Sequence, residues 1–242
     1  MRTLRFPTFI VAAALVCALL DSCSARKNSP LQEERVPEAT GSAGSATSSQ
    51  PEDSRPVIVA FGDSLTAGVT TPNYPEQLQE LLDSSGLRFR VDNQGVSGDT
   101  TTDGLARIGN VMAAHPSLVI LEFGGNDGLR GIPIEATRSN LEQMIEHIQA
   151  ARTALVLLGI TLPPNYGPEY VKPFTALFPA LARKYHIPYI PFLLANVYQH
   201  RELMQPDGIH PNGAGNRIVA QDVFQLIRPL LQSLPAHRAG QP

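Results

Sequence analysis

The chain has little of several residue types on which common protein chemistries depend. Its 242 residues include two cysteines and no tryptophan, and aromatic residues make up 6% of the sequence. Both cysteines, Cys17 and Cys23, lie near the N-terminus, so the body of the chain has neither a disulfide framework nor a cysteine-based zinc site. Any catalysis in the body must therefore use Ser, His, Asp or Glu.

An excess of positive charge is also lacking, and three common motifs are missing. The 19 Lys and Arg residues stand against 22 Asp and Glu residues, which gives a net charge of −3. Such a chain has no surplus of cations with which to bind the phosphates of a nucleic acid. The sequence contains no Walker loop, no GxGxxG after an expected strand and no HExxH, so phosphotransfer, dinucleotide-binding and zinc-protease functions lose their support.

The N-terminal part of the sequence indicates an export signal followed by a tether. Two arginines precede an apolar run at 9–20, which is too short to span a membrane and is typical of a signal peptide. The run ends in Leu-Asp-Ser-Cys, which resembles a bacterial lipobox and predicts lipidation of Cys23; ordinary cleavage without lipid is the alternative. Residues 24–55 are rich in small and polar residues and contain no aromatic, which predicts a disordered tether.

These features predict the organisation of the chain and its destination. We expect a signal peptide at 1–23, a tether at 24–55, a globular domain at 56–234 and a C-terminal tail at 235–242. The protein is then exported to the cell envelope. It is either lipid-anchored at the outer membrane, facing the periplasm, or soluble in the periplasm or secreted.

The body of the chain has the pattern of an α/β domain. Short β-branched runs alternate with longer segments of helical period, which is typical of βαβ units and a parallel sheet. The pattern predicts strands at 57–61, 89–93, 118–122, 154–160 and 189–191, and helices at 74–84, 101–115, 133–151, 168–185 and 213–233. Open sheets of this kind bind ligands beyond the carboxyl ends of their strands.

Four polar segments lie where such a site is expected. Ser64 follows the first strand directly, in a position suited to a nucleophile. Gly98 follows the second strand, where its backbone N–H can approach an oxyanion, and Asn126 follows the third strand with a side-chain amide donor. Asp207 and His210 are three residues apart near the C-terminus, so a turn can bring the carboxylate to Nδ1 of the imidazole and aim Nε2 at the serine.

Together the four segments resemble the SGNH hydrolases, the GDSL-type esterases. The four residues after which that family is named correspond to Ser64, Gly98, Asn126 and His210, in the same order. The resemblance covers residues 56–233. It is strongest in GGNDGLRG at 124–131, LPPNYG at 162–167 and DGIHPNGAGN at 207–216, which are similar to the bacterial thioesterase I, lysophospholipase and arylesterase subgroup. It implies a flavodoxin-like three-layer α/β/α sandwich with a five-stranded parallel sheet.

The resemblance also implies the reaction and the residues that perform it. Ser64, Asp207 and His210 would form the catalytic triad, and the backbone of Ser64, Gly98 and the amide of Asn126 would form the oxyanion hole. The neighbouring Asp63 and Asp127 are interpreted as structural. Neither a metal nor an organic cofactor is required, and no obligate protein partner is evident, so the partner is a small acyl ester or thioester.

The resemblance places the acyl group along the loop at 128–133. The residues expected to contact the acyl chain are Leu129 and Ile132, with Ile160, Leu162, Tyr166 and Ile209 as further candidates. Two other functions remain open. A carbohydrate esterase that removes acetyl groups from envelope polysaccharide would use the same four segments, although carbohydrate grooves usually need more aromatic residues. A tethered binding module without activity is the other alternative.

Overall fold

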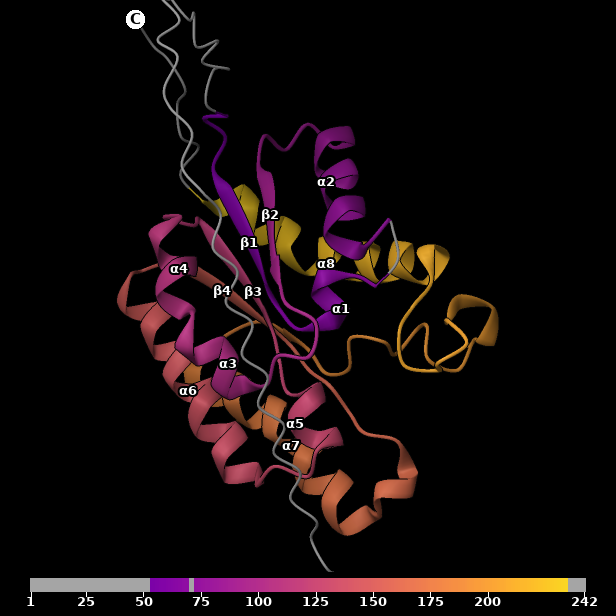
Figure 1. Cartoon of the computed structure of the whole chain (residues 1–242). Helices are drawn as coiled ribbons and strands as arrows, with labels where there is room; N and C mark the ends of the chain where they lie inside the picture. Colours follow the sequence, from indigo (N-terminus) through magenta and orange to yellow (C-terminus); the bar gives the residue numbers. More distant parts are fainter. Residues whose placement is uncertain (1–52, 70–71, 235–242) are drawn as a thin grey trace, which may run out of the picture. The chain divides into compact units, whose positions relative to one another are not determined.

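The computed structural model of the chain describes residues 53–69 and 72–234 (Figure 1). The predicted signal peptide with Cys23, residues 24–52 of the tether and the tail at 235–242 lie outside the described residues. The last tether residues contact the domain, since Arg55 pairs with Asp53 and Asp83 and donates to the Phe89 carbonyl at 3.2 Å. No helix in the described ranges is long and apolar enough to cross a membrane.

A five-stranded parallel sheet forms the centre of the domain. Its strands are β1 (Val57–Gly62), β2 (Arg90–Gly95), β3 (Leu118–Glu122), β4 (Ala154–Leu158) and β5 (Tyr189–Ile190), in the order β2-β1-β3-β4-β5. Every residue of β1 and β3 is buried, as expected for strands that helices cover on both faces. All five predicted strands are confirmed, with ends that differ by at most two residues.

Helices cover both faces of the sheet, which gives three layers. On one face α2 (Tyr74–Ser84) packs against α8 (Gly213–Ser233), and on the other face α6 (Ile134–Ala150) and α7 (Pro168–Tyr185) pack side by side (Figure 1). These four helices match the predicted ones to within one residue. Asn73 begins α2 with a capping box completed by Glu76, which explains why the sequence pattern located this start so closely.

One predicted helix is wrong in detail. The expected helix at 101–115 is two short helices, α3 (Thr101–Ala106) and α4 (Ile108–Ala113). Arg107 separates them because its backbone, with φ −110° and ψ 9°, leaves the helical conformation. The guanidinium of Arg107 hydrogen-bonds to the carboxyl edge of the sheet, and these contacts with residues distant along the chain are invisible to a helical period.

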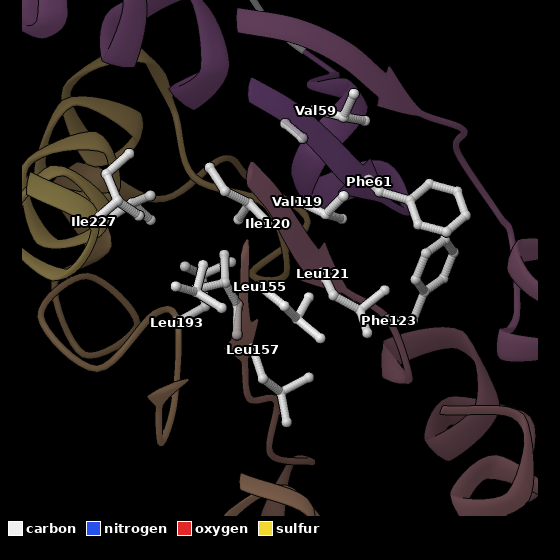
Figure 2. Packing of buried hydrophobic residues seen from close by; sticks show 14 of the residues in the cluster. Val59, Phe61, Val119, Ile120, Leu121, Phe123, Leu155, Leu157, Leu193 and Ile227 are labelled. Carbon is white, nitrogen blue, oxygen red and sulfur yellow. The ribbon is translucent and has the colours of Figure 1, made fainter. Parts of the chain in front are cut away.

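The core lies between the sheet and the two helix layers. Figure 2 shows Ile120 of β3 on the side of Ile227 from α8, while its neighbours Val119 and Leu121 point to the other face. This alternation is the ordinary geometry of a strand. At the carboxyl end of the sheet the rings of Phe61 and Phe123 meet edge to face, with centroids 4.8 Å apart (Figure 2). Phe61 and Phe123 directly precede the segments that carry Ser64 and Asn126.

Candidate active site

The turn after β1 positions Ser64. The residue begins α1 (Ser64–Ala67), and Asp63 caps this short helix by accepting the Leu65 N–H at 3.0 Å. Glycine is required at position 62, because a Cβ there would overlap with the Thr66 hydroxyl and the carboxyl group of Glu122. The strand therefore passes into a tight helical turn that leaves the Ser64 hydroxyl at the carboxyl edge of the sheet.

The loop before α8 brings an acid and a base to this serine. The Nε2 atom of His210 lies 2.8 Å from Ser64 Oγ, and its Nδ1 atom lies 2.7 Å from Asp207 Oδ2. The other oxygen of Asp207 accepts the backbone N–H groups of Ile209 and His210, which closes the turn between the two residues. Burial alone would raise the pKa of Asp207, but these hydrogen bonds lower it below its ordinary value. The carboxylate thus stays ionised beside the imidazole.

Two loops bring potential oxyanion donors to the same edge. Gly98 lies in the turn after β2 with φ +89°, a conformation that favours glycine. Within the described residues, the N–H groups of Ser64 and Gly98 donate to no protein acceptor. The side-chain amide of Asn126 in α5 (Gly125–Leu129) donates to the Asp99 carbonyl at 2.9 Å and to Asp63 Oδ2 at 3.2 Å. Its orientation is therefore set by two neighbouring segments.

Two buried carboxyl groups lie beneath the nucleophile turn. Burial raises the pKa of Asp63 to about 6. Glu122 ends β3 with its side chain fully buried, and burial together with the nearby Asp63 raises its pKa well above the ordinary value. Glu122 Oε2 accepts the Asp63 N–H at 3.3 Å and the Thr66 hydroxyl at 2.9 Å. The pair supports the turn from below, a role that the sequence pattern did not indicate for Glu122.

Asp127, the residue after Asn126, also supports the site from within. It is fully buried and accepts the N–H and hydroxyl of Thr101 and the hydroxyl of Thr137. These bonds connect the start of α3 to α5 and to α6. The contacts match the structural interpretation of this residue.

An apolar pocket opens beside Ser64. It has a cavity volume of about 90 Å³ and is partly open to solvent. Ser64, Leu129, Ile160, Leu162 and Ile209 line it together with Asn126. Two of the six expected acyl contacts lie outside this lining. These two are Ile132 and Tyr166. The Tyr170 hydroxyl donates to the Ile132 carbonyl and the Tyr166 hydroxyl to the Leu129 carbonyl, so two tyrosines hold the backbone of the loop at 128–133.

The far wall of the pocket comes from a segment that motif analysis did not single out. Phe192, Leu194 and Tyr198 line it from the loop after β5, and the rings of Phe192 and Tyr198 meet edge to face with centroids 6.0 Å apart. The apolar run after the last predicted strand was the available signal. An apolar run does not tell whether its side chains line a pocket or fill the core, because that depends on the segments that pack against it.

The geometry joins a hydroxyl, an imidazole and a carboxylate in one hydrogen-bonded chain at the entrance to an apolar pocket. This arrangement is that of a serine hydrolase. Comparison with known proteins agrees: residues 60–218 match the GDSL-like lipase/acylhydrolase family. The chain belongs to this family and is a hydrolase of acyl esters or thioesters.

Several relatives share most of the domain. Esterase TesA of Pseudomonas aeruginosa is 38% identical over 178 residues, which cover 72% of this chain and 89% of the relative. Thioesterase 1/protease 1/lysophospholipase L1 of Escherichia coli is 37% identical over 175 residues, covering 72% of this chain and 84% of the relative. A crystal structure of TesA superimposes with a TM-score of 0.69 and 38% identity, over 72% of this chain and 99% of that structure.

Proposed function

We propose that the protein hydrolyses medium- and long-chain acyl esters and thioesters through an acyl-enzyme on Ser64. One observation carries the proposal: Ser64 Oγ lies 2.8 Å from His210 Nε2 and lines an apolar pocket at the same time. A nucleophile beside a base accounts for the reaction, and an apolar pocket beside the nucleophile accounts for the acyl group. The names of the relatives, an esterase and a thioesterase/lysophospholipase, agree with such substrates.

The proposed reaction has two stages. Ser64 Oγ attacks the acyl carbonyl carbon while His210 Nε2 takes the hydroxyl proton, and His210 then returns this proton to the departing alcohol or thiol. A water molecule attacks the resulting acyl-serine with His210 again as base, which releases the fatty acid and restores the Ser64 hydroxyl. Asp207 holds the imidazole through Nδ1 and stabilises its positive charge in both stages.

The proposed oxyanion hole contains two backbone donors and one side-chain donor. The N–H groups of Ser64 and Gly98 have no protein acceptor among the described residues and are available from the start. The amide of Asn126 has both hydrogens engaged, and its longer bond, 3.2 Å to Asp63, is the one we expect it to exchange for the oxyanion. Removal of one such donor typically lowers kcat by about 10²- to 10³-fold.

Replacement of Ser64 tests the proposal directly. The Ser64→Ala variant should retain its fold and lose at least about 10³-fold in kcat on p-nitrophenyl octanoate, because one member of a catalytic unit is missing. A fluorophosphonate probe should label the parent at Ser64 and leave the variant unlabelled. Ser84→Ala, which alters an exposed serine at the end of α2, is the matched control and should behave like the parent. Labelling elsewhere, or full turnover by Ser64→Ala, would exclude the mechanism.

For the rest of the chain we propose export to the cell envelope. The predicted signal peptide at 1–23, tether at 24–55, domain at 56–234 and tail at 235–242 support this destination, with a lipid on Cys23 as the anchor. Intact-mass measurement of protein extracted from membranes should find a diacylated or triacylated N-terminal cysteine. The Cys23→Ala variant should lack the lipid and leave the membrane fraction. An unmodified N-terminus beyond residue 23 in the parent would exclude lipidation and leave the catalytic proposal intact.

A further inference from the structure

Arg107 joins three segments at the carboxyl edge of the sheet. From the break between α3 and α4, its Nη2 atom donates to the Gly62 carbonyl at 3.0 Å and its Nη1 atom to the Gln94 carbonyl at 2.7 Å. Its Nε atom donates to the Asp99 carboxylate at 2.7 Å. The side chain is 20% exposed and that of Asp99 is 14% exposed, so solvent screens this ion pair only in part.

The guanidinium is also held from its flat side. It lies over the Phe61 ring at 4.5 Å from the centroid, and the Phe123 ring is 5.6 Å away. A guanidinium that lies over one ring and donates to three separate acceptors has a fixed position. Lysine offers neither the planar shape nor the three fixed donor directions.

Two of the three acceptors of Arg107 lie close to parts of the proposed oxyanion hole. Gly62 lies two residues before Ser64 and is the last residue of β1. Asp99 is bonded to Gly98, and its backbone carbonyl accepts the side-chain amide of Asn126 at 2.9 Å. The Gly62 carbonyl also accepts the Val96 N–H at 3.0 Å, which ties the nucleophile turn to the loop of Gly98. Arg107 therefore bonds directly to the segments of Ser64 and Gly98, and it reaches Asn126 through Asp99.

We propose that Arg107 is a positioning residue that holds the three oxyanion donors in register with one another. It touches neither the substrate nor the reacting atoms, and the inference rests on the proposed function. The donors come from three strand ends that share no covalent connection nearby, so their relative placement depends on contacts of this kind. A displacement of about 1 Å in such a constellation can lower the rate about 10²-fold.

Replacement of Arg107 should therefore reduce kcat far more than it changes KM. We expect Arg107→Met, which keeps an apolar stem against Phe61, to lower kcat on p-nitrophenyl octanoate by about 10²-fold with KM within about 3-fold, because the lost interactions act in the transition state. Arg107→Lys should lose about 10-fold or more. Asp99→Asn, a nearly isosteric change, should lower kcat by about 5- to 10-fold. If Arg107→Met does not fold, the Arg107→Lys and Asp99→Asn variants provide the test.

A second readout separates positioning from a general structural role. A trifluoromethyl ketone with an octyl chain forms a hemiketal oxyanion with a catalytic serine, so its affinity should fall by the same factor as kcat/KM in each variant. Affinity for octan-1-ol, which is uncharged and forms no oxyanion, should stay within about 2-fold of the parent because uniform ground-state contacts are unchanged. Leu118→Ala, a buried change at the amino end of β3, is the stability control and should lower the unfolding midpoint while keeping kcat.

Three results would refute the inference. The first is that Arg107→Met and Arg107→Lys both retain kcat within about 3-fold of the parent. The second is that the affinities for the ketone and for octan-1-ol fall equally. The third is that Leu118→Ala loses kcat in proportion to its stability, as the arginine variants do. A parent protein that neither hydrolyses the ester nor takes up a fluorophosphonate would instead refute the proposed function. The two failures are therefore distinguishable.

Discussion

Leu129 and Ile132 lie three residues apart in one loop, and only Leu129 lines the pocket. This difference allows a matched experiment on acyl-chain selectivity. Leu129→Ser removes an apolar wall from the path of the acyl chain, whereas Ile132→Ser makes a similar change outside the lining. We expect only the first variant to alter the dependence of kcat/KM on chain length.

The magnitude follows from the area that the pocket can cover. A fully buried methylene is worth about 0.8 kcal/mol, and a pocket that is open on one side covers roughly half of it, or about 0.4 kcal/mol. Four additional methylenes between butanoyl and octanoyl then favour the longer chain by about 1.6 kcal/mol, which is about 15-fold. Loss of the Leu129 side chain uncovers two or more of these methylenes and should cost octanoyl substrates about 4- to 15-fold, with acetyl substrates changed less than about 2-fold.

The assay is a series of p-nitrophenyl esters from acetyl to dodecanoyl, with acyl-CoA and acetylated xylan as further substrates. Thermal unfolding of both variants checks that the fold is retained. An equal loss on acetyl and octanoyl esters, or an Ile132→Ser profile that matches Leu129→Ser, would show that the acyl chain does not pass Leu129. A kcat/KM that is highest for acetylated sugar and flat across the acyl series would favour the carbohydrate-esterase alternative.

Two further predictions concern polar residues of the site. Asn126→Ala should lower kcat by about 10²- to 10³-fold with little change in KM, measured by initial rates, and an effect confined to KM would assign the amide to ground-state binding. Asp63→Asn should change the pH dependence of stability, because the pKa of Asp63 rises from 3.8 to about 6 on folding. The protonated group favours the folded state, so the parent should lose about 2 kcal/mol relative to the variant as the pH rises from about 4 to 7. Urea unfolding at several pH values measures this difference. A difference in unfolding free energy between parent and variant that does not change with pH would contradict the prediction.

Local sequence determined much of the secondary structure and the order of the polar segments. The continuous apolar runs at 57–61 and 118–121 became parts of fully buried strands, because a strand with no polar face must be covered on both sides. Helix starts such as that of α2 carry their own capping residues, so they were visible in the sequence. The spacing of Asp207 and His210 likewise predicted their contact, since hydrogen bonds within four residues close the turn between them.

Only the tertiary structure determined the features that segments distant along the chain form together. The pocket wall of Phe192 and Tyr198, and the break at Arg107, arise from contacts between different strand ends, for which the sequence has no local signal. The same holds for the raised pKa of Glu122, because the cost of its charge is set by complete burial beside Asp63. Periodicity and motifs report what a residue does with its near neighbours, whereas desolvation and cross-strand hydrogen bonds exist only after the sheet has brought β1, β2 and β3 together.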